Sequence, residues 1–387
     1  MIPLAKPLVG AREEELVLET LRSGRLALGP QLDAFEAALS RVLGPPVSAV
    51  SSGTAGLHLA IRAAGIEGGD EVVTTPFSFV ASANCLLYEN AKPVFCDIDP
   101  RTLNMAPAAA EAAVTDRTTG LLPVHIFGYP ADLPAFEALA ARRKLWLVED
   151  ACEALGAWHG DGARVGGRGN LAVFAFYPNK QITTGEGGAV VCTDEAVKER
   201  VDSERNQGRA PDMGWLDHDR LGFNYRLDEL SCALGVAQLE HLDELLAARD
   251  RVASLYSGAL ADVEELDLPC PDSDGDRRSW FVYVVQLPPA VDRDAAIEAM
   301  RERGVDTKPY LPAIHLMSFY RERFGHREGE FPVCEDVARR SLALPFFGDL
   351  TEAEIEQVVA ALRDVIAVQR SGLTSATKPG KPRAARR

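Results

Sequence analysis

Short apolar segments alternate with longer helical ones between about residues 47 and 190. Residues 71–75, 92–96 and 120–125 are examples of the apolar segments, and their length is typical of buried strands. Strands that alternate with helices form a largely parallel sheet whose faces are covered by those helices. The pattern therefore predicts an α/β fold.

The later part of the chain has a different pattern. Apolar side chains near helical spacing predict one long helix over residues 228–260, which would link two domains. Residues 280–287 then predict a strand and residues 292–304 a helix. Thr351 and Glu354 form a candidate capping box at the start of the last helix. These elements predict a second, smaller α+β domain.

The two patterns divide the chain into a large domain, residues 1–248, and a small C-terminal domain, residues 249–370. The N-terminal segment is a candidate to pack on the small domain. Residues 371–387 have five basic and no acidic side chains, contain Pro and Gly, and show no periodicity. This composition predicts a disordered basic tail.

Composition and charge agree with a two-domain globular protein. A chain of 387 residues with 47% apolar content can bury a large core. The net charge is −16, and without the basic tail the rest is more acidic still, so we expect no binding to nucleic acid or to anionic membranes.

Cysteine and histidine usage bears on compartment and metals. The seven cysteines are scattered, odd in number and without C-x-x-C spacing, which favours a reducing cytoplasm over a disulfide framework or a zinc site. The histidines show no H-E-x-x-H spacing, so we expect no metal. The N-terminus has no apolar signal core, and no run of 18 apolar residues predicts a membrane span.

Lys180 is the first candidate for chemistry. It lies in VFAFYPNKQITTGEGGA (173–189), between a short apolar run and a loop rich in Gly, Thr and Glu. A lysine held beside closely approaching backbone can serve as a reactive amine. Most lysines are surface charges, so this interpretation depends on the neighbours of Lys180.

Asp150 follows the apolar run 145–148 in LWLVEDACEALGA. A short run bounded by charge predicts a buried strand, and ligands of α/β sheets bind beyond the carboxyl ends of strands. Alone, Asp150 could equally be a helix cap or a loop acid. With Lys180 it forms a more specific pair, because pyridoxal phosphate needs an acid at its ring nitrogen and a lysine at its aldehyde.

A third segment, VSAVSSGTAGLHLAIRAAG (47–65), predicts a strand that leads into a helix. Small residues let the backbone approach an anion, and the free amides of a helix N-terminus favour phosphate. Gly53, Thr54 and Ala55 are thus candidates for a phosphate site, although an ordinary capped turn has the same pattern.

Two aromatic residues, Phe77 and Phe79, follow the predicted strand 71–75. An aromatic side chain in such a loop can stack on a flat heteroaromatic ring. Either residue could instead belong to the core.

These motifs resemble those of the DegT/DnrJ/EryC1/StrS family of pyridoxal-phosphate-dependent sugar aminotransferases, of the aspartate aminotransferase superfamily. The similarity covers nearly all of residues 1–366. It includes SSGTAGLHLA (51–60), PFSFVASAN (76–84), VEDACEALGA (148–157), FYPNKQITTGEGGAV (176–190) and GFNYRLDELSCALGVAQL (222–239). The resemblance implies fold type I: a large domain with a mostly parallel seven-stranded sheet, one strand reversed, flanked by helices, and a smaller α+β C-terminal domain.

The resemblance also implies roles for single residues. Lys180 matches the lysine that binds the cofactor aldehyde and moves protons, and Asp150 matches the acid that pairs with the pyridinium nitrogen. Phe79 matches the aromatic stacked on the ring, and residues 53–55 match the phosphate-binding segment. Asn224 matches an asparagine that reaches the phosphate of the neighbouring subunit, which implies a homodimer.

The chain departs from the family pattern at two positions. Many relatives have a serine that binds the phosphate where this chain has Ala175, and Asn179, Ser51 and Ser52 are candidates to replace that contact. Where relatives often have Gln or His near the ring oxygen, this chain has Glu153. A carboxylate beside a phenolate oxygen is repelled unless it is protonated or paired, so we expect a raised pKa for Glu153.

The predicted reaction is transfer of an amino group from an amino acid, L-glutamate in relatives, to a nucleotide-linked ketosugar, for polysaccharide or natural-product glycosylation. Arg25, Arg226 and Lys308 are candidates to offset the negative charge of that substrate. Three alternatives remain: an aminotransferase acting on a cyclitol ketone, a deoxysugar dehydratase, and a cofactor-binding sensor without turnover. Lys180 argues against the dehydratase, since such relatives have histidine at that position.

Overall fold

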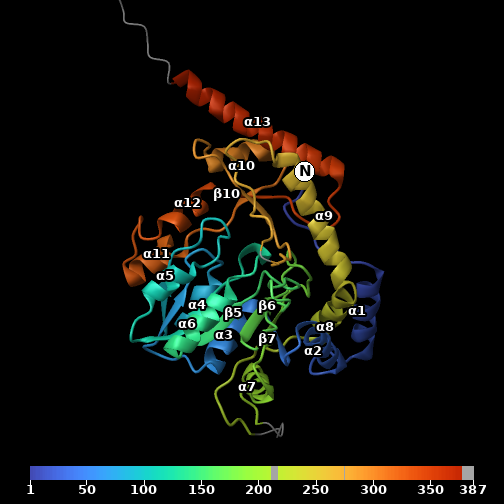
Figure 1. Ribbon diagram of the computed structural model, residues 1–387. Coiled ribbons are helices and arrows are strands. Elements are labelled where there is room, and N and C mark those ends of the chain that lie inside the picture. Colours follow the sequence, from blue (N-terminus) through green and yellow to red (C-terminus); the bar gives the residue numbers. More distant parts are fainter. Residues whose placement is uncertain (211–216, 274, 377–387) are drawn as a thin grey trace, which may run out of the picture.

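The computed structural model of the protein describes residues 1–210, 217–273 and 275–376 (Figure 1). Its centre is a seven-stranded sheet with the strand order β1-β7-β6-β5-β4-β2-β3. The strands are β1 (Val47–Val50), β2 (Glu71–Thr74), β3 (Lys92–Phe95), β4 (Thr118–Leu122), β5 (Trp146–Asp150), β6 (Leu171–Ala175) and β7 (Gly188–Val191).

One strand of this sheet is reversed. β7 is antiparallel to both β1 and β6, whereas the other strand pairs are parallel. The mostly parallel seven-stranded sheet of fold type I is therefore confirmed.

Helices cover both faces of the sheet, as Figure 1 shows. The side chains of β6 illustrate the arrangement, because Val173 packs into the apolar cluster under α3 and α4 while Phe174 packs on the opposite side with α2. The helices of the large part are α1 (Ala11–Ser23), α2 (Pro30–Leu43), α3 (Gly53–Ala63), α4 (Ala81–Tyr88), α5 (Pro107–Ala113), α6 (Leu133–Arg143), α7 (Glu195–Arg205) and α8 (Glu229–Glu240), with a 3-10 turn at Ile126–Gly128. Burial on both faces explains why the strands read as continuous apolar runs.

The later part of the chain forms a second, smaller sheet. Its order is β8-β10-β9, and both pairs are antiparallel. The elements are α9 (Leu242–Leu260), β8 (Tyr283–Gln286), α10 (Arg293–Glu302), β9 (Lys308–Pro309), a 3-10 turn at Ile314–Leu316, α11 (Ser318–Phe324), α12 (Pro332–Arg340), β10 (Ser341–Leu344) and α13 (Glu352–Ala376). An apolar cluster under α9, α10 and α13 gives this part its own core.

The first residues of the chain join that second core. The Ile2 amide donates to the Gly304 carbonyl at 2.8 Å, and the Asp306 amide donates to the Ile2 carbonyl at 3.0 Å. Two residues later, the Leu4 carbonyl accepts from the Phe346 amide at 2.9 Å. The N-terminal segment is thus hydrogen-bonded to residues that follow α10 and β10.

The single helix expected over residues 228–260 is wrong, because the helix is interrupted at His241 (φ −112°, ψ 14°). Asp228 caps α8 by accepting from two backbone amides. The interruption lets two consecutive helices face different partners, since α8 packs on α1 and α2 whereas α9 packs on α13. The proposed domain boundary at residue 248 falls within α9 and stays a prediction.

The capping box at the start of α13 is confirmed, since the Thr351 amide donates to Glu354 Oε2 at 2.9 Å and the Glu354 amide to Thr351 Oγ1 at 3.3 Å. The predicted start of the tail at residue 371 is wrong, because α13 continues to Ala376. No proline interrupts residues 371–376, so helical hydrogen bonding continues past Arg370. The disorder predicted for residues 377–387 lies outside the described residues.

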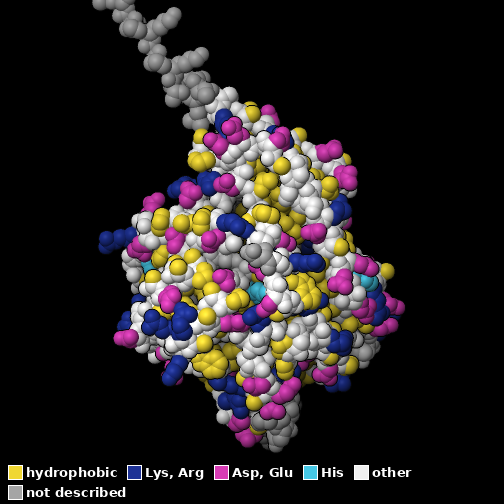
Figure 2. All heavy atoms as spheres, in the orientation of Figure 1, with side chains coloured by type: hydrophobic (Ala, Val, Ile, Leu, Met, Phe, Trp, Pro, Cys, Tyr) yellow, Lys and Arg dark blue, Asp and Glu magenta, His cyan; other side chains and the backbone are white. Residues whose placement is uncertain are grey.

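Acidic and basic side chains are interspersed on the face drawn in Figure 2, with apolar patches between them. The excess of acidic residues therefore does not collect in one region of that face. No helix in the described part of the chain combines the length and apolar character that crossing a membrane requires.

Candidate active site

Several strand ends converge on one cleft of about 530 Å³. β5 ends at Asp150, β6 leads into the loop of Lys180, and β1 leads into α3, all at the same edge of the sheet. Of the eight predicted site residues, six line this cleft: Gly53, Thr54, Phe79, Asp150, Glu153 and Lys180.

Lys180 is held in a closed loop after β6. Its backbone amide donates to the Tyr177 carbonyl at 2.9 Å, and the Phe176 amide donates to the Gly187 carbonyl at 2.9 Å, which ties the two ends of the loop together. The Lys180 side chain is only 13% exposed. Its Nζ lies 3.7 Å from Glu153 Oε1 and 3.7 Å from the centre of the Phe281 ring. The amine is thus confined but not tightly paired.

Asp150 is buried and hydrogen-bonded by neutral groups. Its Oδ2 accepts from the Ser82 hydroxyl at 2.6 Å, and its Oδ1 accepts from the Cys152 amide at 3.2 Å. No lysine, arginine or histidine in the described residues forms an ion pair with it. A buried carboxylate without a cation suits a protonated ring nitrogen, and this donor set fits pyridoxal phosphate.

The N-terminus of α3 forms another wall of the cleft. A Cβ at Gly53 would lie 2.6 Å from Ala175 Cβ and 3.1 Å from Cys152 Sγ, so the backbone approaches β6 more closely than any side chain would allow. The first amides of a helix have no partner within the helix and can bind an anion. Ala55 does not line the cleft, and its amide is bonded to the capping Ser52 hydroxyl at 3.1 Å.

Glu153 is buried, and its Oε2 accepts from the Phe127 amide at 2.8 Å. Burial raises the pKa of Glu153, and the opposing effect of nearby Lys180 only partly offsets this rise. The expected direction is confirmed, although burial and not a neighbouring oxygen anion is the main cause.

The two candidate aromatics have different positions. Phe77 is fully buried and packs edge-to-face on Phe127 with ring centres 5.9 Å apart. Phe79 is 63% exposed at the rim of the cleft. Phe79 alone of the pair is therefore available to a ligand.

Residues beyond α9 that no sequence motif indicated also line the cleft. These residues are Phe281, Tyr310 and Leu311. The Tyr310 hydroxyl accepts from Asn179 Nδ2 at 3.4 Å, and burial raises the pKa of Tyr310. Asn179 Oδ1 is buried without a hydrogen-bond partner and is therefore available to a ligand donor.

Ser82 was also missed, although it lies within the quoted segment PFSFVASAN. Of the candidates for replacing a serine at position 175, Ser52 and Asn179 line the cleft, whereas Ser51 does not. No sequence signal ties the small-domain residues to this cleft.

Asn224 and the candidate cations lie elsewhere in the single chain. Asn224 is exposed and pairs with Asn206 in an isolated bridge. Arg25 donates to the Leu28 carbonyl and Arg226 to Asn206 Oδ1, and Lys308 lies in β9. Neither Asn224 nor any of the three basic residues lines the cleft.

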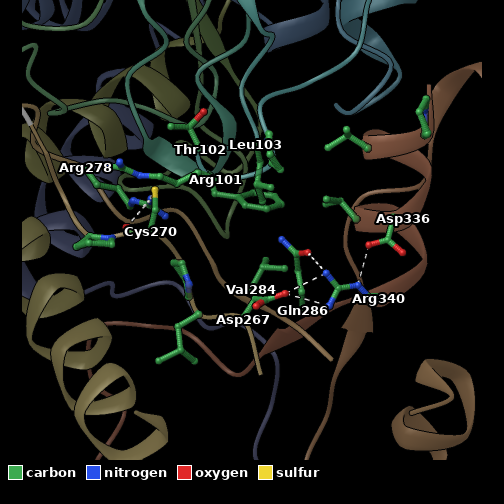
Figure 3. A pocket seen from close by; sticks show the side chains of 18 residues that line it. Arg101, Thr102, Leu103, Asp267, Cys270, Arg278, Val284, Gln286, Asp336 and Arg340 are labelled. Carbon is green, nitrogen blue, oxygen red and sulfur yellow. Dashed lines mark hydrogen bonds and ion pairs between the residues drawn. The ribbon is translucent and has the colours of Figure 1, made fainter. Parts of the chain in front are cut away.

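A second cleft, of about 610 Å³, lies between the large part and the small part (Figure 3). Its floor carries Arg340, which is bonded to Asp267, Asp336 and Gln286. Of its three arginines, Arg340 is paired with carboxylates and Arg278 donates to the Cys270 carbonyl, and no lysine lines this cleft to hold an aldehyde. Within the described residues, no cluster of three or more His, Cys, Asp or Glu side chains could hold a metal ion.

A lysine, a buried acid and a helix N-terminus at one edge of this sheet define the class of pyridoxal-phosphate-dependent aminotransferases of fold type I. The chain belongs to the DegT/DnrJ/EryC1/StrS aminotransferase family, whose model matches residues 7–363.

Similar proteins support this membership over nearly the full length. The chain is 33% identical over 379 residues to the spore coat polysaccharide biosynthesis protein SpsC of Bacillus subtilis (strain 168), covering 94% of this chain and 97% of that protein. The structure of S. venezuelae DesV, solved in complex with a ketimine intermediate, is 34% identical with a TM-score of 0.86, covering 91% and 93% of the two chains. Helicobacter pylori PseC, an aminotransferase involved in the biosynthesis of pseudoaminic acid, is 26% identical with a TM-score of 0.89, covering 95% and 99%.

Proposed function

We propose that this aminotransferase moves an amino group from L-glutamate to a ketosugar carried on a nucleotide. The observation that carries the proposal is the convergence of Lys180, Asp150 and the α3 N-terminus on one cleft. The sugar class is supported by relatives whose names refer to a coat polysaccharide and to pseudoaminic acid.

The residues of the cleft suit distinct tasks. When bound, pyridoxal phosphate supplies an aldehyde that joins an amine and a ring that takes up electrons from the donor carbon. Lys180 Nζ would hold the aldehyde, and the free amine is placed to move a proton from the donor's α-carbon. Asp150 keeps the ring nitrogen protonated, and the amides of Gly53 and Thr54 bind the phosphate. Phe79, at the rim of the cleft, would provide an aromatic face for the ring.

The small-domain wall restricts access of water. Phe281 and Leu311 present apolar surface beside Lys180. Partial exclusion of water strengthens the electrostatic interactions of the amine. Glu153, whose pKa is raised, has a proton to donate nearer to neutral pH than an exposed glutamate.

The working unit is a homodimer in which Asn224 reaches the phosphate of the partner's site. Three large apolar side chains support this: Phe79 is 63%, Tyr177 is 52% and Leu221 is 68% exposed, although the first two are at the cleft. A second copy would bury such side chains. All seven cysteines are free, which supports a location in the reducing cytoplasm.

Replacing Lys180 tests the proposed chemistry. Lys180→Ala removes the covalent anchor and the proton carrier, so we expect it to bind the cofactor but to lose turnover. Borohydride treatment of the wild-type holoenzyme should label the peptide containing Lys180. Near-normal turnover of the variant, or an unlabelled Lys180 peptide, would refute the role.

A substrate panel tests the acceptor class. Half-transamination with glutamate, seen as a shift in cofactor absorbance, separates an enzyme from a sensor. The aminated cofactor is then offered nucleotide-linked ketosugars and free cyclitol ketones. Return of the original absorbance with the cyclitols alone would overturn the nucleotide-sugar proposal.

A further inference from the structure

Arg249 is a buried arginine in α9, with 6% of its surface exposed. Its guanidinium donates to four backbone carbonyls. They belong to two pairs of neighbouring residues, and the two pairs lie far apart in sequence. Nη2 bonds the carbonyls of Asn179 (3.3 Å) and Lys180 (2.5 Å), and Nη1 bonds those of Trp280 (3.4 Å) and Phe281 (3.1 Å). One side chain thus joins the lysine loop, the start of the small domain and α9.

The charge of Arg249 has no carboxylate partner among the described residues. Burial lowers its pKa to about 10, and no opposite charge counteracts this shift. A buried charge is costly unless hydrogen bonds compensate for its lost hydration, and here neutral carbonyls provide that compensation. A leucine or methionine would remove the buried charge but leave these carbonyls without their donor, so the guanidinium serves to tie the two backbone segments together.

Two of these carbonyls belong to Lys180 and Phe281, whose side chains are in contact in the cleft. Lys180 Nζ lies 3.7 Å from the centre of the Phe281 ring, and Arg249 binds the backbone of both residues. Because both backbones are fixed, the amine can move only through rotations of the Lys180 side chain. Such confinement matters for a group that must leave the cofactor and return in each half-reaction, because small misplacements of a reacting group slow the reaction severely.

We propose that Arg249 is a positioning residue. It keeps the backbones of Lys180 and Phe281 in fixed positions relative to each other, where the large and small parts of the chain meet. The proposal rests on the role proposed above for Lys180. It predicts that loss of the guanidinium slows the proton-transfer half-reactions more than it weakens cofactor binding.

The test compares Arg249→Lys, Arg249→Gln and Arg249→Ala with Arg251→Gln. Arg251 is a matched control on the same helix, because its Nη2 also donates to two backbone carbonyls, those of Gly348 and Leu350. For each holoenzyme we measure the melting temperature, the fraction of Lys180 labelled by borohydride, and the single-turnover rate with glutamate.

We expect every Arg249 variant that folds to be labelled at Lys180 but to transaminate about 10- to 100-fold more slowly than Arg251→Gln. Arg249→Lys keeps the charge but cannot reach four carbonyls, so it should be slow as well. Millimolar guanidinium should restore part of the rate of Arg249→Ala, which a merely destabilised protein would not show.

If Arg249→Gln and Arg249→Ala do not fold, the single-turnover rate of Arg249→Lys tests the inference. A rate for Arg249→Lys equal to that of Arg251→Gln would overturn the inference. If the wild-type protein itself is not labelled at Lys180, the proposed role of Lys180 fails instead, so the two failures are distinguishable.

Discussion

Gly53→Ala is the sharpest test of the phosphate site. The added Cβ would lie 2.6 Å from Ala175 Cβ, an atom fixed to the backbone of β6 that cannot rotate away. The start of α3 must therefore shift outward. Overpacking of this kind costs about 1–3 kcal/mol of folding free energy.

The same shift would displace the amides that we propose bind the phosphate. A hydrogen bond to a charged group contributes about 1.5–3 kcal/mol, so the loss of one such bond should weaken cofactor binding about 10- to 150-fold. The assay is fluorescence titration of the apoprotein with pyridoxamine phosphate. This form lacks the aldehyde, so the covalent link to Lys180 does not mask the change.

Gly56→Ala provides the control on the same helix. Its Cβ would lie 2.7 Å from Val173 Cγ1, a similarly short contact although with a methyl group that can rotate, and Gly56 does not line the cleft. We expect both variants to melt a few degrees below the wild type, and only Gly53→Ala to bind the cofactor weakly. Equal affinities for the two variants would refute the assignment of Gly53 to the phosphate site.

The remaining predictions concern the acids and the dimer. Asp150→Asn should slow both half-reactions by about 2–4 kcal/mol in activation free energy, measured by single-turnover absorbance, and an unchanged rate would exclude the role of Asp150. Because the folded-state pKa of Glu153 is raised, its charged form destabilises the fold as pH rises above the unfolded-state value. The apoprotein of Glu153→Gln should therefore melt higher than the wild type near pH 8, with a difference that shrinks toward pH 4.5; a difference independent of pH would contradict this. Mixing Lys180→Ala with Asn224→Ala after subunit exchange should restore roughly a quarter of wild-type activity, since half of the dimers are mixed and each has one intact site; no restoration would count against the shared site.

Local sequence predicted the part of the site that lies at strand ends. Asp150, Lys180 and Gly53 follow strands that are short and apolar, and parallel strands bring their carboxyl ends to one edge. Their convergence therefore follows from a pattern visible in the chain. The roles of these residues stay predictions until they are tested.

Tertiary packing decided the rest, and no local pattern could predict it. Phe281 and Tyr310 reach the cleft from loops next to β8 and β9, about 100 or more residues beyond Lys180 in the sequence. The break at His241 depends on which helices α8 and α9 pack against. The amide of Ala55 is used by the capping Ser52 hydroxyl, a detail of the first helical turn that the sequence pattern does not show.

The bonds of Ile2 and Leu4 to residues of the small domain bear on how the chain matures on the ribosome. Residues 2 and 4 bind partners at positions 304, 306 and 346, which are synthesised about 300 or more residues later. Ile2 and Leu4 therefore lack these hydrogen-bond partners while the large sheet forms. An affinity tag fused directly before Met1 would therefore lie close to the junction with positions 304 and 306.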